Sequence, residues 1–137
     1  MPYPEDVEEL RGEVDVLVSC LEPAEAERFG LEREGGLCAA AGIEFVSFPI
    51  PDHTAPAELH AARELARGLA ARVRQGRRVV THCLAGIGRS PTIAAAALLE
   101  LGLPLDDILR RMARARGYPV PEMPEQLAWL RRFVSPS

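Results

Sequence analysis

The chain has 137 residues and a formal net charge of −4. This length fits one domain, residues 1–137, which can bury roughly two thirds of the surface of its unfolded chain. The negative charge disfavours nucleic acids and acidic membranes as partners, because binding to either needs clustered cations. All 16 basic residues are arginine, which excludes lysine-dependent chemistry such as Schiff-base catalysis or a nucleotide-binding phosphate loop.

Cysteine usage and hydropathy indicate the compartment. Cys20, Cys38 and Cys83 are too far apart in sequence for a metal or disulfide framework, and their odd number suits a reducing cytosol. The acidic first six residues lack the pattern of a signal peptide. No uncharged apolar run is long enough to span a membrane. We therefore expect a cytoplasmic monomer that needs no metal or cofactor.

The first half of the chain alternates between strand and helix patterns. Residues 14–19 are apolar and β-branched, which predicts a strand, and a short helix follows from Glu22 until Gly30. A second helix is predicted over residues 31–41 and a second strand over residues 43–48. A turn-rich loop over residues 49–56 precedes a long amphipathic helix over residues 57–74, which Thr54 can cap.

The second half begins with a short β-branched strand over residues 77–82. An Ala-rich helix follows and ends at Gly102, and two more helices are predicted over residues 105–116 and 124–134. Strands that alternate with helices predict the α/β class. We expect a central, mostly parallel, twisted sheet of about four strands with helices on both faces.

The most informative segment lies between the strand that ends at His82 and the Ala-rich helix. Its glycines let the backbone curl so that successive N–H groups point inward and form an anion-binding nest. The helix adds its positive N-terminal end at the same place. The phosphate-binding loop predicted here consists of Leu84, Ala85, Gly86, Ile87, Gly88 and Arg89.

Cys83 and Arg89 flank this loop. Amide donors, a helix N-terminus and a neighbouring arginine favour the thiolate of Cys83, which is the nucleophilic form. The planar guanidinium of Arg89 matches two oxygens of a phosphoryl group. Ser90 can donate a hydrogen bond to the sulfur. The alternative interpretation of a cysteine at a strand end is a small buried apolar residue.

This segment resembles the signature of protein tyrosine and dual-specificity phosphatases: a cysteine, five residues and an arginine, preceded by His82 and followed by Ser90. The resemblance implies a phosphatase of the protein tyrosine phosphatase-like fold. Gly88 stands where many dual-specificity members have serine, a change that we expect the loop to tolerate. Leu84 and Ile87 stand where phosphoinositide-directed relatives carry basic residues, so lipid headgroups with several phosphates are disfavoured.

A second catalytic group is needed, because the leaving oxygen requires a proton and the attacking water requires a base. Asp52 is the best candidate, since it follows a predicted strand and lies between Pro51 and Pro56. The segment from Phe48 to Asp52 resembles the general-acid loop of small dual-specificity and kinase-associated phosphatases. The alternative is that Asp52 only stabilises a turn.

Three further residues receive roles from the resemblance. Residues 121–126 resemble the segment that positions the hydrolytic water, with Gln126 as the candidate and Glu125 as the alternative; both also suit the first turn of a helix. Cys20 follows the first strand, where some relatives carry a cysteine that protects the nucleophile by forming a disulfide. His82 is predicted to be a structural histidine that orients the loop.

The favoured function is metal-independent hydrolysis of phosphotyrosine, and of phosphoserine or phosphothreonine, in proteins through a phosphocysteine intermediate. A small phosphomonoester is the other candidate substrate. A phosphate-binding module without turnover would need neither Cys83 nor Asp52. A sulfurtransferase or arsenate reductase also uses a loop cysteine, but a proline-flanked acidic loop is not expected there.

Overall fold

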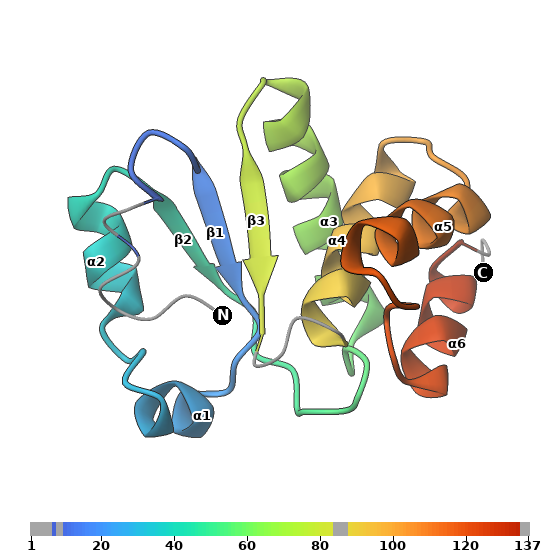
Figure 1. The fold of residues 1–137 in the computed structure, drawn as a ribbon, viewed down its shortest axis with the longest axis horizontal. Helices are drawn as coiled ribbons and strands as arrows, with labels where there is room; N and C mark the ends of the chain where they lie inside the picture. Colours follow the sequence, from blue (N-terminus) through green and yellow to red (C-terminus); the bar gives the residue numbers. More distant parts are fainter. Residues whose placement is uncertain (1–6, 8–9, 84–87, 135–137) are drawn as a thin grey trace.

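The structure is a computed structural model that describes Val7 and residues 10–83 and 88–134. Figure 1 shows a small sheet with helices on either side of it. The elements in chain order are β1 (Val16–Ser19), α1 (Pro23–Arg28), α2 (Glu34–Ala40), β2 (Glu44–Ser47), α3 (Leu59–Arg74), β3 (Val79–His82), α4 (Arg89–Glu100), α5 (Leu105–Arg116) and α6 (Pro124–Val134). The predicted α/β class is confirmed, although the described residues form three strands rather than about four.

The three strands are parallel and lie in the order β2-β1-β3. Ser19, at the end of β1, pairs with Ser47 of β2 and with His82 of β3. The carboxyl ends of all three strands therefore meet at one edge of the sheet, where α/β proteins commonly bind their ligands.

Side chains of β1 alternate between two apolar layers. Val16 and Val18 pack with Leu69 of α3 and Ile93 of α4 on one face. Leu17 packs on the other face with Cys38 of α2. Because both faces of β1 are covered, its residues are buried throughout and read as a continuous apolar run. A third layer, between α3, α4, α5 and α6, is built around Trp129, Leu130 and Phe133.

Two helix starts differ from the sequence prediction. The long helix begins at Leu59, with Glu58 at its N-cap, and not at residue 57. Thr54 does not cap it, because Thr54 lies four residues before this N-cap. Its hydroxyl donates to the carbonyl oxygen of Pro51 across 2.6 Å. The hydroxyl satisfies a local turn instead, as threonine often does. The second helix begins at Glu34, three residues later than predicted.

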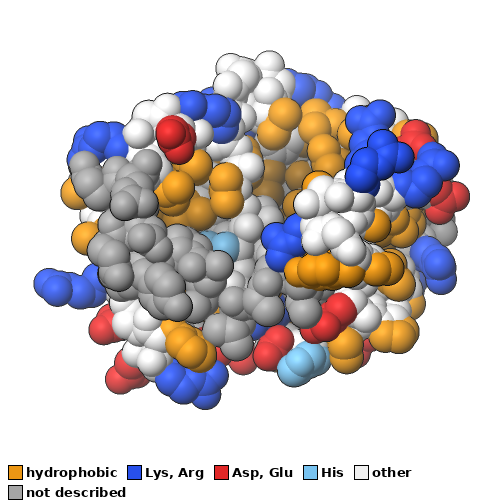
Figure 2. All heavy atoms as spheres, viewed as in Figure 1, with side chains coloured by type: hydrophobic (Ala, Val, Ile, Leu, Met, Phe, Trp, Pro, Cys, Tyr) orange, Lys and Arg blue, Asp and Glu red, His pale blue; other side chains and the backbone are white. Residues whose placement is uncertain are grey.

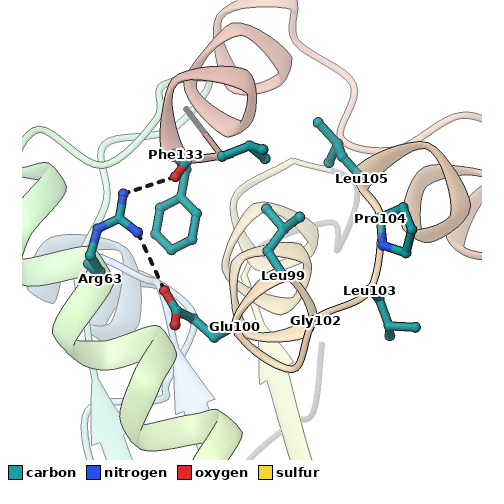
Figure 3. A pocket seen from close by; sticks show the side chains of 9 residues that line it. Arg63, Leu99, Glu100, Gly102, Leu103, Pro104, Leu105 and Phe133 are labelled. Carbon is teal, nitrogen blue, oxygen red and sulfur yellow. Dashed lines mark hydrogen bonds and ion pairs between the residues drawn. The ribbon is translucent and has the colours of Figure 1, made fainter. Parts of the chain in front are cut away.

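A cavity of about 270 Å³ lies where α3, α4 and α6 meet, near the last turn of α4 (Figure 3). Arg63 of α3 closes one side, donating to the carbonyl oxygen of Phe133 across 2.9 Å and pairing with Glu100 across 3.5 Å. Its guanidinium also lies 4.3 Å from the centre of the Phe133 ring. Since α4 has 12 residues, this cavity and the N-terminal end of α4 are separated by about 16 Å.

No helix in the described ranges is long and apolar enough to cross a membrane. The same part of the chain holds no group of three or more His, Cys, Asp or Glu side chains placed to bind a metal ion.

Candidate active site

Cys83 directly follows β3 and lies beside the first turn of α4. Its side chain is almost fully buried, with 3% of the residue exposed. The backbone N–H of Ser90 donates to the Cys83 Sγ across 3.4 Å, and the Ser90 hydroxyl oxygen lies 3.3 Å from the same sulfur. Two groups that can donate to a thiolate are therefore in place at the N-terminus of α4. The predicted loop residues Leu84, Ala85, Gly86 and Ile87 lie outside the described residues.

Arg89 is held at one end of its guanidinium by Glu25 of α1. Its Nη1 donates to Glu25 Oε1 across 2.7 Å, and its Nη2 donates to Glu25 Oε2 across 2.9 Å. Nη1 also donates to the carbonyl oxygen of Ile50 across 2.8 Å. The Nε–H has no hydrogen-bond partner among the described residues. The side-on edge formed by Nε and Nη2 therefore remains for an oxyanion.

Arg89 stays positively charged although its side chain is buried. Loss of solvent alone would lower the pKa of this guanidinium, but the hydrogen bonds and charge of Glu25 outweigh that effect and leave the pKa raised. The same contact lowers the pKa of the Glu25 carboxyl. Both partners are thus ionised, and their two-point contact fixes the plane of the guanidinium.

Asp52 reaches the same guanidinium from the loop that follows β2. Its Oδ1 lies 3.5 Å from Arg89 Nη2 and accepts the backbone N–H of His53 across 2.9 Å. The side chain is 45% exposed, so it can meet a substrate from the solvent side. Asp52 therefore lies at the edge of Arg89 that Glu25 leaves open.

Comparison with known proteins gives the family of the chain. A family model described as a polymorphic toxin system, DSP-PTPase phosphatase, matches residues 3–103. The chain belongs to this phosphatase family. No curated protein sequence matches the chain.

Three solved structures of phosphatases illustrate the fold of this chain. The active form of Tk-PTP is 32% identical, with a TM-score of 0.84 over 98% of this chain and 87% of that chain. Kinase associated phosphatase, with its catalytic-site cysteine replaced by serine, is 22% identical, with a TM-score of 0.83 over 95% of this chain and 74% of that chain. PTPMT1 in complex with PI(5)P is 20% identical, with a TM-score of 0.83 over 98% and 86% of the two chains. At identities below 25%, these last two similarities describe the fold alone.

Gln126 of α6 is fully buried, and its side-chain amide lies against Gly88 of the predicted phosphate-binding loop. Its Nε2 donates to the carbonyl oxygen of Thr54 across 3.1 Å, and its Oε1 accepts the N–H of Met123 across 3.2 Å. A Cβ atom at Gly88 would lie 2.9 Å from that Nε2. A side chain at position 88 would therefore displace the Gln126 amide, so the glycine that stands there fits the packing of Gln126. Glu125, the alternative to Gln126, is exposed.

His82 forms a buried pair with Glu34 of α2. The His82 Nε2 lies 3.0 Å from Glu34 Oε1, and both side chains are at least nine-tenths buried. Among the residues that the structure describes, the second ring nitrogen of His82 and the second oxygen of Glu34 have no hydrogen-bond partner. The pair fixes the ring orientation of the residue that precedes Cys83.

Cys20 lies in the same apolar layer as Cys83, whereas Cys38 lies on the opposite face of the sheet. The Cys20 N–H donates to the carbonyl oxygen of His82 across 2.9 Å. Burial, with a smaller effect of nearby Cys83, raises the pKa of the Cys20 thiol to about 12. Burial also raises the pKa of Cys38 to about 11. None of the three cysteines forms a disulfide.

The structure therefore places Cys83, Ser90, Arg89 and Asp52 together, with Gln126 against the end of the loop. Sequence reasoning missed Glu25 and Glu34, the partners of Arg89 and His82. Both glutamates lie in the first turn of a helix, Glu25 in α1 and Glu34 in α2. Acidic residues are common in a first turn for the sake of the helix dipole alone, so this position gave no specific signal.

Replacing Glu25 by glutamine is expected to lower the kcat/KM of the phosphatase by about 10²-fold, the loss expected when a reactant-binding group is misplaced by about 1 Å. The amide keeps one acceptor but loses the charged two-point contact with Arg89. Steady-state kinetics on an aryl phosphate measure the effect. Glu27→Gln, at an exposed position of the same helix, is the matched control. Equal kinetics in the two variants would show that Glu25 does not position Arg89.

Proposed function

We propose that this phosphatase hydrolyses phosphomonoesters without a metal, through a phosphocysteine intermediate. The proposed substrates are phosphotyrosine proteins, with phosphoserine and phosphothreonine proteins or a small phosphomonoester as further candidates. The observation that supports this proposal most is that Cys83 and Asp52 are both brought to Arg89. Cys83 precedes the helix that Arg89 begins, and Asp52 lies 3.5 Å from the open edge of the guanidinium.

In the first step, the Cys83 thiolate attacks phosphorus and the bond from phosphorus to the leaving oxygen breaks. Arg89 binds two phosphoryl oxygens through its Nε and Nη2 edge, while Glu25 holds the opposite end. Asp52 donates its proton to the leaving oxygen. The products are the free alcohol or phenol and a phosphorylated Cys83.

In the second step, water attacks the phosphorylated cysteine. Asp52, now a carboxylate, takes a proton from the water, and the bond between sulfur and phosphorus breaks. Gln126 positions this water through the amide hydrogen that its bond to Thr54 leaves available. Ser90 stabilises the departing thiolate through its N–H, which donates to Cys83 Sγ, and through its hydroxyl. Inorganic phosphate is released.

The experiment that tests the function is hydrolysis of p-nitrophenyl phosphate in the presence of a chelator, with vanadate as inhibitor. Acid quenching with a ³²P-labelled substrate should trap label on the peptide that contains Cys83. A panel of phosphopeptides, phosphosugars and a phosphoinositide then ranks the substrate classes. Phosphate binding without turnover would favour a binding module. Sulfur transfer or arsenate reduction with no phosphate release would favour the remaining alternatives.

Replacing Gly88 by alanine tests the role of Gln126. The added methyl group would displace the Gln126 amide, which lies 2.9 Å from the Cβ position. We expect hydrolysis of the phosphocysteine to slow by about 10 to 10²-fold, because the water loses its positioning group, while formation of the intermediate is less affected. Rapid-quench kinetics separate the two steps.

The control for this variant is Gly36→Ala, because a Cβ atom at Gly36 has no heavy atom of the rest of the protein within 4 Å. The role of Gln126 would be contradicted if Gly88→Ala left the hydrolysis step as fast as in the control.

Cys20 is proposed to protect Cys83 from irreversible oxidation. The two cysteines follow Ser19 and His82, which are paired across β1 and β3, so their Cα atoms are expected within the roughly 7 Å that a disulfide allows. Peroxide converts the Cys83 thiol to sulfenic acid and water; the Cys20 thiol then displaces a second water and forms the disulfide. Dithiothreitol reduces this disulfide and restores both thiols.

The prediction is that Cys20→Ser loses most of its recoverable activity after brief peroxide exposure and dithiothreitol, whereas the unmodified protein recovers. The high pKa of Cys20 makes its attack slow, so the protection should increase as the pH is raised. Cys38→Ser is the matched control. Equal recovery in all three proteins, with no peptide linking Cys20 to Cys83, would exclude the role.

The compartment and oligomeric state remain predictions. The expected reducing cytosol rests on the odd number of well-separated cysteines. Sedimentation velocity of the purified protein tests the expected monomer.

A further inference from the structure

Thr81 of β3 is a polar residue in an apolar layer. It pairs with Val18 of β1 and, like Val79 two residues earlier, lines a cavity of about 200 Å³ between β3, α3 and α4. Every other residue that lines this cavity is apolar. Figure 2 shows hydrophobic side chains gathered in a hollow over this part of the molecule. A hydroxyl in such a layer costs stability unless a polar group meets it.

The group that meets this hydroxyl is the carbonyl of Ser90. Thr81 Oγ1 donates to the Ser90 carbonyl oxygen across 3.0 Å. The backbone N–H of the same Ser90 donates to Cys83 Sγ across 3.4 Å, and its hydroxyl oxygen lies 3.3 Å from that sulfur. Thr81 and Cys83, which are two residues apart, therefore hold Ser90 at its carbonyl and at its N–H.

The contact from Thr81 differs from the other threonine contact at the start of α4. Thr92 Oγ1 donates to the carbonyl oxygen of Gly88 across 2.8 Å, which closes the first turn of the helix on itself. The bond from Thr81 crosses from the strand to the helix, so it fixes the position of Ser90 relative to the end of β3. Without this bond, the first turn of α4 can move relative to β3, and both contacts of Ser90 with the sulfur weaken.

We propose that Thr81 is a positioning residue that holds Ser90 against the sulfur of Cys83. The inference rests on the covalent role proposed for Cys83. In the second step, water attacks phosphorus, the bond between sulfur and phosphorus breaks, and the sulfur leaves with the electron pair as a thiolate. Ser90 stabilises that thiolate. Thr81 therefore assists the release of Cys83 without touching the substrate.

The first test replaces Thr81 by valine, which keeps the β-branched shape and removes the hydroxyl. The rate of alkylation of Cys83 by iodoacetamide, followed on its peptide by mass spectrometry as a function of pH, reports the thiolate without any turnover. The midpoint of this profile should rise by about half a pH unit in Thr81→Val, which corresponds to part of one hydrogen bond. Thr81→Ser, which keeps the hydroxyl, should retain the midpoint of the unmodified protein.

The titratable groups around Cys83 are unchanged in both variants, so a shifted midpoint reports the contacts of Ser90. In the described part of the chain, these groups are Cys20 after β1, Glu25 of α1, Asp52 of the loop after β2, His82 of β3 with its partner Glu34 of α2, and Arg89 of α4.

The second test separates the two chemical steps by rapid-quench kinetics with an aryl phosphate. Hydrolysis of the phosphocysteine should slow by about three- to tenfold in Thr81→Val, the factor that corresponds to one neutral hydrogen bond, while its formation is less affected. Val79→Ala is the matched control for stability. It weakens the packing of the same strand around the same cavity and leaves both contacts of Ser90 in place.

An alkylation profile of Thr81→Val that coincides with that of the unmodified protein would overturn the proposal, as would an equal shift in Val79→Ala. Circular dichroism shows whether each variant is folded, and Thr81→Ala repeats both tests if the valine variant is not. The alkylation profile needs no substrate. A shifted midpoint in a protein that releases no phosphate would therefore support the role of Thr81 and contradict the proposed function alone.

Discussion

Replacing Cys83 by serine is expected to reduce turnover of an aryl phosphate by at least about 10³-fold, since loss of the nucleophile in another covalent enzyme costs about 10⁶. A serine hydroxyl is a weak nucleophile without an adjacent base. Affinity for phosphate or vanadate should be retained, because Glu25 still holds Arg89 and the N-terminus of α4 is unchanged. Steady-state kinetics and calorimetric titration with phosphate measure the two quantities.

The matched control is Cys38→Ser, which alters a buried cysteine on the opposite face of the sheet. It should keep both activity and affinity. Residual activity of Cys83→Ser within tenfold of the unmodified protein would contradict a covalent mechanism. Loss of phosphate affinity together with turnover would instead show that the substitution disturbs the loop.

Replacing Asp52 by asparagine is expected to lower turnover by roughly 10² to 10⁴, the range for lost acid-base catalysis, on substrates with poor leaving groups. Aryl phosphates with good leaving groups need less protonation and should lose less. The basic limb of the pH profile should flatten, because that limb reports loss of the proton that Asp52 donates. Kinetics on a series of substituted phenyl phosphates measure both effects.

The contact between Asp52 and Arg89 gives this prediction a second readout. Asparagine removes a negative charge 3.5 Å from Arg89 Nη2, so phosphate no longer competes with a carboxylate for that edge. Phosphate should therefore bind Asp52→Asn at least as tightly as the unmodified protein. An unchanged leaving-group dependence and pH profile would assign the acid to another residue.

The Glu25 carboxylate also links the active site to pH. Pairing with Arg89 lowers the pKa of Glu25, so the stabilisation from this pair is present above the ordinary carboxyl pKa. It is lost as the pH falls through the lowered value. Glu25→Gln carries no such proton-linked contribution, so its free energy of unfolding should decline less on acidification than that of the unmodified protein.

The placement of Cys83 and Arg89 at one site could be predicted from sequence because β3, the loop and the start of α4 are contiguous. The glycines, the strand before them and the helix after them carry the signal together. Asp52 could be predicted because it follows a strand whose carboxyl end meets the same edge of the sheet. The mostly parallel sheet also followed from the strand and helix pattern. That β1 and β3 are the neighbours that bring Cys20 beside Cys83 is a finding of the structure.

The supporting groups could not be predicted, because they come from distant parts of the chain. Glu25 lies 64 residues from Arg89, and Glu34 lies 48 residues from His82. The packing of Gln126 against Gly88 likewise depends on how α6 meets α4. Thr54 had the residue type of a helix cap, but the helix begins at Leu59, and the Thr54 hydroxyl donates within its own turn instead. Such choices depend on three-dimensional distance and not on spacing along the chain.

Glu25 also serves its own helix. Its Oε1 accepts the backbone N–H of Glu22, which completes a capping box at the start of α1. A helix of six residues has little stability of its own, so α1 and the orientation of Arg89 depend on each other. A surface helix usually accepts insertions and exchanges freely. Here a change in the length of the connection between β1 and α1 would disable phosphate recognition in a protein that still folds.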